Sequence, residues 1–368
     1  MKGRSDLAFE IRHLKIDFRF DLKFRISNWK SVFSSNMNRN ELLSLISRFS
    51  AQRVVLLGDL VADEFVYGEI TRVSREAPVL ILKEQERHIV PGGGANAANN
   101  LADLGAQVDI VGAVGDDESG EALVRYFQQK SVSTRHVLRV RGYRTPTKSR
   151  ILGGLSHWQR QQIVRVDRQP EAPFSPEIRR RVTEGARPLL ENASALLVSD
   201  YGFGATNHTE IERLLNKSKA QALLTTIDSR YELLSYTNFT AATPNEPEVE
   251  VAFGARIGNN TELLHELGAK MLRRQKLKAL LVTRGREGMV LFQPRAKPEH
   301  IPIFGTDEAV DVTGAGDTVI AAFTLALATG ASFLNAAEIA NCAGGLVVMK
   351  RGTATVTRRE LEEAIRNS

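Results

Sequence analysis

Apolar and polar residues change their spacing along the chain in a regular order. Residues 54–57 are four consecutive apolar residues followed by a glycine, which is typical of a strand buried on both faces. Further strands of this kind are predicted at residues 108–114, 195–198, 223–227, 279–282 and 289–292. Segments with a helical pattern are predicted at residues 41–49, 95–104, 119–129, 209–220, 315–328, 333–349 and 357–366. This alternation predicts an α/β fold, with a mostly parallel sheet covered by helices on both faces.

Two stretches break this rhythm. Residues 65–90 and 139–167 are richer in β-branched and charged residues than in helix formers, so we expect extra strands outside the main sheet. Ligands of open α/β sheets bind at the carboxyl ends of the strands, which makes a small β-lid over that edge the natural placement. The second stretch carries the basic residues Arg139, Arg141, Arg144, Lys148, Arg150, Arg160 and Arg165. One or two of these, pointing inward, would suit an anionic substrate.

Residues 1–38 differ from the remainder, which we interpret as a single domain over residues 39–368. Residues 14–26 alternate strictly between apolar and charged residues, a strand pattern without an evident partner. We interpret the extension as an added edge strand, an interaction arm, or translated sequence upstream of the true start, for which Met37 is a candidate.

Composition narrows the classes of protein. The extension holds a net charge of +4 out of the chain's total of +6, so the basic pI is poor evidence for binding nucleic acid. The single cysteine, Cys342, excludes an internal disulfide and fits a reducing compartment, so we expect a cytoplasmic protein. No apolar run is long enough to span a bilayer, and no secretory leader is evident.

Residues 311–317, with the sequence DVTGAGD, are the most informative segment. Gly314 and Gly316 leave the backbone uncovered just before a long apolar helix, so amide N–H groups and the helix dipole can converge on an anion. Asp317 adds a carboxylate at the same place, and an anion site beside a base is what phosphoryl transfer to a hydroxyl requires. A plain glycine turn with Asp317 as a helix-start residue is the alternative.

Four other motifs lie at expected strand ends or helix starts, and each also has a structural interpretation. Asp59 and Asp63 follow the first strand, where they could bind sugar hydroxyls. Alternatively, they stabilise a turn and cap a helix. The glycines at 92–94 allow the backbone to approach a ligand closely, and Asn96 could bind a polyol. Alternatively, the segment is a flexible hinge before a helix.

Asn245 and Glu248 lie three residues apart at a helix start. They could order a hydrated magnesium ion, or form a capping box. Residues 282–288 supply a hydroxyl, glycine amides and cations suited to nucleotide phosphates, or make a hairpin turn. No Walker-type GxxxxGK[ST], HExxH or GxSxG motif occurs in the chain, and no GxGxxG follows the first strand.

Taken together and in this order, the motifs resemble those of the ribokinase-type, or phosphofructokinase B, family of sugar kinases. The resemblance covers roughly residues 50–366, and residues 92–99 and 311–317 look like the two signatures of the family. Within it the chain is most similar to the heptose 7-phosphate kinases, the kinase half of ADP-heptose synthase. That similarity rests on residues 58–59, 67–68, 72–79, 147–150, 164–167, 199–201 and 352–356.

The resemblance implies a ribokinase-like three-layer sandwich with a small β-lid, and an ATP- and Mg²⁺-dependent phosphotransferase. It implies Asp317 as the base and Gly314, Ala315 and Gly316 as the anion hole, with Asn245 and Glu248 ordering the magnesium ion. The residues expected at the sugar are Asp59, Asp63, Gly93, Gly94, Asn96, Lys148, Arg150 and Asp200. Those expected at the nucleotide are Asn245, Thr283, Arg284, Gly285, Gly288 and Asn341.

The most specific expectation is transfer of the ATP γ-phosphoryl group to O1 of D-glycero-D-manno-heptose 7-phosphate. Phe203, where relatives often have lysine, and Gly94, where alanine is more usual, bear on the exact sugar. Ribose, fructose or a hexose phosphate is the alternative substrate, and a non-catalytic sugar or nucleotide sensor is the alternative class. Exposed lid strands favour a homodimer through the lid. The chain lacks an HxGH motif, so we expect a separate nucleotidyltransferase to act next.

Overall fold

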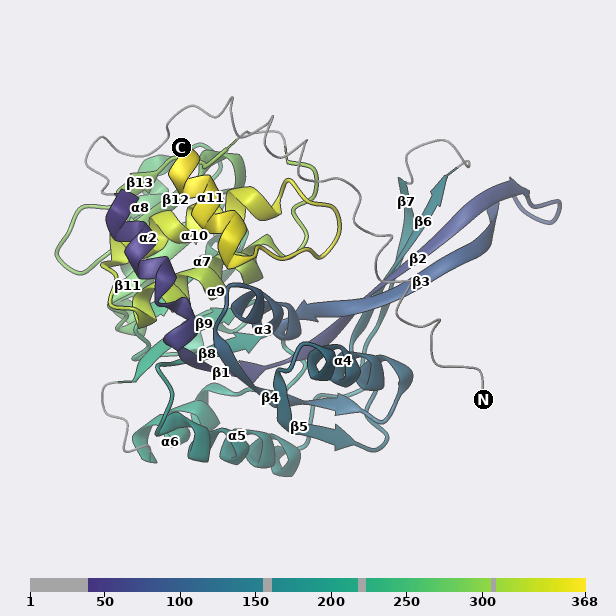
Figure 1. Ribbon diagram of the computed structural model, residues 1–368, viewed down its shortest axis with the longest axis horizontal. Coiled ribbons are helices and arrows are strands. Elements are labelled where there is room, and N and C mark those ends of the chain that lie inside the picture. The colour runs from purple at the N-terminus through teal and green to yellow at the C-terminus, as the bar shows by residue number, and fades with distance from the viewer. Residues whose placement is uncertain (1–38, 155–160, 218–222, 306–308) are drawn as a thin grey trace, which may run out of the picture.

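The computed structural model describes residues 39–154, 161–217, 223–305 and 309–368. Its centre is a nine-stranded sheet with the strand order β13-β12-β11-β10-β9-β8-β1-β4-β5 (Figure 1). The strands are β1 (Arg53–Gly58), β4 (Gln107–Gly115), β5 (Ser133–Val140), β8 (Ala195–Asp200), β9 (Leu224–Ser229), β10 (Ala241–Ala242), β11 (Ala279–Thr283), β12 (Met289–Phe292) and β13 (Glu299–Ile301). Neighbours from β5 to β11 pair in parallel, and β12 pairs antiparallel with both β11 and β13.

Helices cover both faces of this sheet, and the core has two corresponding halves. One face carries α2 (Arg39–Ser47), α3 (Gly94–Asp103), α4 (Glu118–Gln129), α9 (Ala315–Ala328), α10 (Phe333–Val347) and α11 (Arg358–Asn367). The other carries α5 (Pro176–Leu190), α6 (His208–Lys217), α7 (Glu246–Phe253) and α8 (Thr261–Gln275). Because strand side chains alternate between faces, Val54 and Leu56 of β1 enter the first half and Val55 and Leu57 the second. The fold is therefore a three-layer sandwich.

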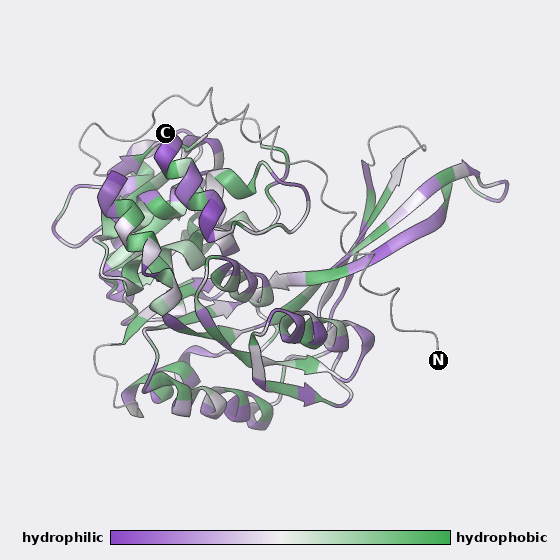
Figure 2. Cartoon of the chain, in the orientation of Figure 1, coloured by the Kyte–Doolittle hydropathy of each residue, from purple (hydrophilic) through white to green (hydrophobic). Residues whose placement is uncertain are grey.

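Four further strands form a separate sheet that projects from the body (Figure 1). They are β2 (Leu60–Val73), β3 (Leu80–Gly93), β6 (Thr147–Gly154) and β7 (Gln161–Arg168), in the order β3-β2-β6-β7. Strand β2 begins two residues after β1 ends, and β3 runs directly into α3, so this lid is rooted at the carboxyl edge of the main sheet. Figure 2 shows a hydrophilic stretch in the middle of β3, at residues 83–88, which agrees with the exposure of this part of the strand.

Most of the predicted elements are confirmed, and one boundary is wrong. Arg139 lies in β5, which pairs in parallel with β4 in the main sheet, so the second lid stretch does not begin at residue 139. Arg141 and Arg144 lie in the connection from β5 to β6. Strands β5, β10 and β13 and helices α5 and α8 were not predicted from the pattern, and the helix start predicted at Asn245 is that of α7.

Some of the predicted features involve residues that the structure does not describe. Residues 1–38, residue Arg160 and the end of the helix predicted at 209–220 lie outside the described residues. Among the residues that are described, no helix is both long enough and apolar enough to cross a membrane.

Candidate active site

The first turn of α9 is shaped by Gly314. This residue has φ 76°, a left-handed conformation that favours glycine, and it precedes the helix as its N-cap. A Cβ atom at this position would lie 2.5 Å from Nδ2 of Asn96, so the close approach also excludes a side chain. The loop before it is held by Asp311, which accepts hydrogen bonds from the backbone N–H of Thr313 at 2.9 Å and of Gly352 at 2.9 Å. The N–H of Ala315 donates to the backbone oxygen of Val312 at 3.3 Å, and the first turn of the helix lines the cavity beside it.

Asp317 lies in the first turn of α9 and is 3% exposed. Its Oδ1 accepts a hydrogen bond from the hydroxyl of Tyr201 at 2.8 Å, and its Oδ2 accepts one from Nδ2 of Asn96 at 2.8 Å. Burial raises the pKa of Asp317 to about 6, and these two hydrogen bonds oppose that rise. The carboxylate is thus oriented from two sides and is mostly ionised at neutral pH.

Asn96 belongs to a chain of buried polar groups on α3. Asn100 donates to both the backbone oxygen and Oδ1 of Asn96, at 3.0 and 3.2 Å, and the hydroxyl of Thr318 donates to Oδ1 of Asn100 at 2.9 Å. Since Oδ1 of Asn96 is an acceptor in this chain, its amide N–H₂ group is turned toward Asp317.

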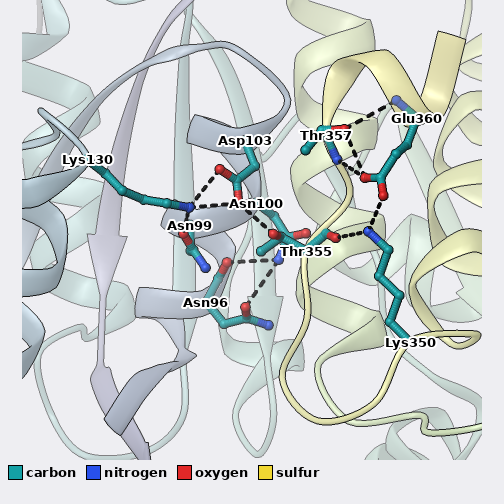
Figure 3. A network of polar contacts seen from close by, with 9 residues as sticks. All are labelled: Asn96, Asn99, Asn100, Asp103, Lys130, Lys350, Thr355, Thr357 and Glu360. Carbon is teal, nitrogen blue, oxygen red and sulfur yellow. Dashed lines mark hydrogen bonds and ion pairs between the residues drawn. The ribbon is translucent and has the colours of Figure 1, made fainter. Parts of the chain in front are cut away.

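The same helix is tied to the C-terminal part of the chain (Figure 3). Lys130, which follows the last residue of α4, donates to Asn99 and Asp103 of α3, and the hydroxyl of Thr355 also donates to Asp103. Lys350 donates to the backbone oxygen of Thr355 at 2.6 Å and pairs with Glu360 of α11. These contacts fix residues 350–357, whose Thr353 donates to Oδ2 of Asp63 at 2.6 Å.

A cavity of about 520 Å³ lies between the lid and the carboxyl edge of the main sheet. Asp317 and the glycine turn form part of its lining, and a second cavity of about 170 Å³ shares Thr283, Ala315 and Gly316 with it. The predicted site residues that line the first cavity are Asp63, Gly93, Lys148, Arg150, Asn245, Glu248, Thr283, Gly314, Ala315, Gly316 and Asp317. Those that line the second are Thr283, Gly285, Gly288, Ala315, Gly316 and Asn341. Most of the predicted residues are therefore brought together.

Asp59 does not line either cavity, contrary to our expectation of a sugar contact. It is 1% exposed, and its carboxylate accepts hydrogen bonds from the backbone N–H groups of Tyr201, Phe203 and Ala205, at 2.9, 3.0 and 2.8 Å. Burial raises the pKa of Asp59 to about 6, with nearby Asp200 adding to the rise. This carboxylate anchors the loop after β8.

The expected sugar contacts Asp200, Gly94 and Asn96 do not line the cavity either. Asp200 accepts from the hydroxyls of Ser229 and Tyr236, both at 2.9 Å, and so joins β8 to β9 and the chain after it. A Cβ atom on Gly94 would lie 2.7 Å from the backbone oxygen of Asp59, so this glycine permits close packing of α3 on the strand end. Asn96 reaches the site through its hydrogen bonds to Asp317 and to the backbone oxygen of Gly314.

Arg284, expected at the nucleotide, is also absent from both cavity linings. Its side chain is 9% exposed and forms an ion pair with Glu246 of α7, with Nε and Oε2 2.6 Å apart. Its charge is therefore neutralised inside the protein and joins the β11–β12 turn to α7.

The structure contains a capping box at the start of α7. Oδ1 of Asn245 accepts from the backbone N–H of Glu248 at 2.8 Å, and Glu248 accepts from the backbone N–H of Asn245 at 2.9 Å. Both residues also line the cavity, so the structural role and a metal-ordering role are compatible.

Pattern reasoning missed Asp228, which lines the cavity beside Glu248. Burial and the carboxylates of Glu248, Asp317 and Asp200 hold the pKa of Asp228 well above its ordinary value, and burial also raises that of Glu248. Within the described residues, the buried hydroxyl of Thr243, on the same cavity wall, has no hydrogen-bond partner. Oxygen donors with excess negative charge match the ligands that Mg²⁺ prefers. The position of Asp228 at the end of a predicted strand was a usable signal, since carboxyl ends of parallel strands face the ligand crevice.

Four basic residues line the lid side and mouth of the cavity: Lys148, Arg150, Arg165 and Arg230. Arg150 pairs with Asp63 at 2.9 Å, and Arg165 pairs through two nitrogens with Asp167. The ammonium of Lys148 lies 5.1 Å from the centre of the Tyr201 ring, and burial lowers its pKa. In the described part of the chain no carboxylate lies within ion-pair distance of Lys148 or of the exposed Arg230.

Comparison with known proteins places this geometry in context. A family model described as pfkB family carbohydrate kinase matches residues 52–359. The bifunctional protein HldE of Pelobacter propionicus is 35% identical over 89% of this chain, and that of Geobacter sulfurreducens is 34% identical over 88%. The chain spans about two thirds of the length of these curated relatives, 66% and 65%.

Two solved structures share the fold at low sequence identity. Phosphofructokinase-2 from Escherichia coli has a TM-score of 0.66 and 18% identity, and covers 86% of this chain and 98% of its own. Arabidopsis thaliana ribokinase, solved in complex with ribose and ATP, has a TM-score of 0.64 and 22% identity with the same coverage.

Proposed function

The chain belongs to the pfkB family of carbohydrate kinases, and from this premise we propose that it phosphorylates O1 of D-glycero-D-manno-heptose 7-phosphate with ATP. The observation that carries the proposal is a buried carboxylate, Asp317, in the first turn of a helix, on a cavity that basic side chains also line. The similarity to the HldE proteins supports a heptose phosphate as the acceptor.

In the proposed reaction, Asp317 accepts the proton of the sugar hydroxyl while the oxygen forms its bond to the γ-phosphorus. The bond between that phosphorus and the β–γ bridging oxygen breaks, and ADP leaves. The amides of Gly316 and Asp317 donate hydrogen bonds to the oxygens of the moving phosphoryl group, and the dipole of α9 favours the same charge. The carboxylate needs no change of orientation during the step, because Tyr201 and Asn96 already hold it.

The residues of the cavity fit a magnesium ion. Glu248 and Asp228 would hold it, with Asn245 and the hydroxyl of Thr243 beside them. When bound, the ion would offset negative charge on the phosphate oxygens.

The second cavity suits the nucleotide base. Its walls include Ile303, Val319, Gly344 and Gly345, and Gly345 packs so closely that a Cβ atom would lie 2.2 Å from the backbone oxygen of Phe304. The lining of this cavity is largely apolar, which suits a nucleotide base better than a sugar. The shared wall at Thr283, Ala315 and Gly316 would then carry the phosphates toward Asp317.

The lid side of the cavity suits a second phosphate at the far end of the sugar. Lys148 and Arg230 face the cavity without a carboxylate partner among the described residues, and Arg165 adds a further cation. These cations interact with the cavity carboxylates only at longer range, so a phosphorylated acceptor would give them a direct hydrogen-bonded partner that an unphosphorylated sugar lacks. This charge balance favours a sugar phosphate over ribose or fructose.

Assembly and the next reaction are also part of the proposal. The lid exposes Val73, Val79, Leu80, Ile163, Val164 and Val166, and among the described residues β3 and β7 are the edge strands of its sheet. We propose that a second copy covers this surface, and Val164→Lys should then shift the dimer to monomer in light scattering. A wild-type monomer would contradict the idea. The sugar 1-phosphate would next serve a separate nucleotidyltransferase, in the cytoplasm where ATP is available.

A substrate panel tests the function. The purified protein would be assayed for ADP release with ATP and Mg²⁺ on heptose 7-phosphate, fructose 6-phosphate, fructose and ribose, and ³¹P NMR would locate the new phosphate. We expect the highest kcat/KM with the heptose phosphate and a signal from an anomeric phosphate. A preference for another sugar, or transfer to another hydroxyl, would overturn the heptose assignment.

Two charge-removing variants test the phosphate position. Lys148→Met and Arg230→Met should each lower kcat/KM for the phosphorylated sugar by about 10- to 100-fold, the value of one charge-assisted hydrogen bond. Lys270→Met is the matched control. Lys270 belongs to α8, lies over the ring of Phe253 at the end of α7, and lines neither cavity. Equal losses with phosphorylated and plain sugars would contradict the phosphate role.

A further inference from the structure

Tyr201 and Asn96 both donate a hydrogen bond to Asp317, but only one of them lines the cavity. Asn96 is fully buried inside the chain of amides on α3, and it does not line the cavity. Tyr201 comes from the loop after β8 and does line the cavity. Tyr201 is thus the partner of the base that lies on the side from which the sugar must arrive.

Tyr201 is itself held firmly. Its backbone N–H donates to Oδ2 of Asp59, and the same buried carboxylate binds two further amides of the loop. One ring edge packs against Gly93, where a Cβ atom would lie 3.3 Å from Cδ2 of the tyrosine. Lys148 lies over the ring face at 5.1 Å from its centre. The hydroxyl therefore has a fixed direction toward Asp317.

The phenol is a permanent donor in this position. Burial and the negative charge of Asp317 hold the pKa of Tyr201 well above its ordinary value, so it keeps its proton throughout the working range of pH. A carboxylate offers about four acceptor positions, and the bonds from Tyr201 and Asn96 occupy one on each oxygen. The remaining positions are free to meet an incoming hydroxyl.

We propose that Tyr201 is a positioning residue for phosphoryl transfer, whose phenol fixes the Asp317 carboxylate and favours its ionised form before the sugar hydroxyl arrives. The proposal rests on the role of Asp317 as base in the proposed function. It gives a purpose to the buried carboxylate of Asp59, which is otherwise distant from the chemistry: Asp59 holds the loop that carries the tyrosine.

The charged groups around Asp317 set its response to pH. Lys148 of β6 favours the ionised carboxylate, and Asp63 of β2 opposes it. Asp228 of β9 also lies near enough to interact with it. Tyr201 is neutral and acts only through its hydrogen bond, so its removal should change the pKa of Asp317 without changing any charge in the cavity.

The test is Tyr201→Phe, which keeps the ring and its packing and removes only the hydroxyl. Loss of one hydrogen bond to a charged group, about 1.4 kcal/mol, corresponds to about one pKa unit. The acid limb of the pH profile of kcat/KM should therefore move upward by about one pH unit, because a carboxylate with one donor fewer is protonated more easily. The plateau kcat should fall about tenfold, as expected for a less well-positioned base.

Two other variants complete the experiment. Tyr231→Phe is the matched control, because Tyr231 lines the same cavity and is 68% exposed, so its acid limb should stay at the wild-type pH. Tyr201→Leu gives a second measurement: the limb should move as far as in Tyr201→Phe, with a larger fall in kcat from the lost ring. Circular dichroism and ATP affinity establish that each variant is folded.

An acid limb that stays in place in both Tyr201 variants overturns the proposal whatever happens to kcat, because a merely structural tyrosine would lower kcat alone. The experiment uses whichever sugar the wild-type protein phosphorylates best. A different preferred sugar would therefore refute the heptose assignment and leave the Tyr201 test valid. Wild-type turnover in Asp317→Asn would refute the base itself.

Discussion

Replacing Asp317 by asparagine should remove most of the activity and make the protein more stable. The amide has nearly the same shape as the carboxylate, so its oxygen can still accept from Asn96 while its N–H₂ group donates to the hydroxyl of Tyr201. The fold should therefore be retained. The amide cannot accept the proton of the sugar hydroxyl, and loss of a general base lowers turnover by about 10²–10⁴-fold.

The gain in stability follows from the pKa of the native side chain. Burial raises the pKa of Asp317 from 3.8 to about 6, a difference worth about 3 kcal/mol between its two protonation states. The folded state binds this proton more tightly than the unfolded chain does, so the contribution is fully present below pH 3.8 and is lost as the pH rises through 6. Above that pH the native protein keeps a buried charge that the asparagine variant lacks.

The measurement is the free energy of unfolding in urea at pH 8 and pH 5, together with kcat at pH 8. We expect the variant to be more stable than the wild type by up to about 3 kcal/mol at pH 8 and by about half as much at pH 5, where the unfolded chain is already mostly ionised. A variant whose kcat stays within threefold of the wild-type value would refute the base assignment. Equal stabilities at pH 8 would refute the argument that a desolvated charge lies at this position.

Three further predictions follow from neighbouring contacts. Gly314→Ala should lower both stability and kcat, by about 1–3 kcal/mol in unfolding free energy, because a Cβ atom would meet Asn96 and the left-handed backbone is strained; unchanged kcat would show that the turn geometry is irrelevant. Glu248→Gln should raise the Mg²⁺ concentration for half-maximal rate about tenfold or more, measured at saturating ATP, and an unchanged Mg²⁺ curve would exclude Glu248 from ordering the metal. Asp59→Asn should destabilise the protein by about 1–3 kcal/mol, measured in urea, because one amide cannot satisfy three backbone N–H groups; equal stability would contradict the anchoring role.

The sequence predicted the elements that have a strong local pattern. Residues 315–328 were predicted as a helix with the same bounds that α9 has, because a glycine turn precedes a continuous apolar run. The second lid stretch was less well placed, because residues 133–140 have the composition of a lid strand and only their pairing with β4 puts them in the main sheet.

The parts of the site that depend on the backbone geometry of a motif were predicted well. The parts that depend on the direction of a side chain were predicted less well. Asp59 and Asp63 lie four residues apart after the same strand, yet Asp63 lines the cavity and Asp59 turns inward to amides more than 140 residues away in sequence. No local pattern encodes such a partner. Tyr201 belonged to a motif that carried the family resemblance, but its contact with Asp317 depends on the packing of three distant segments.

The short segment before α11 touches both halves of the site. Gly352 donates to Asp311 in the turn that precedes α9, and its neighbour Thr353 donates to Asp63 in lid strand β2. A ligand that shifts Asp311 or Asp63 would therefore affect the other residue through Gly352 and Thr353. ATP and the acceptor need not touch for one to alter the affinity of the other. Cooperative binding of the two substrates would then depend on these two hydrogen bonds.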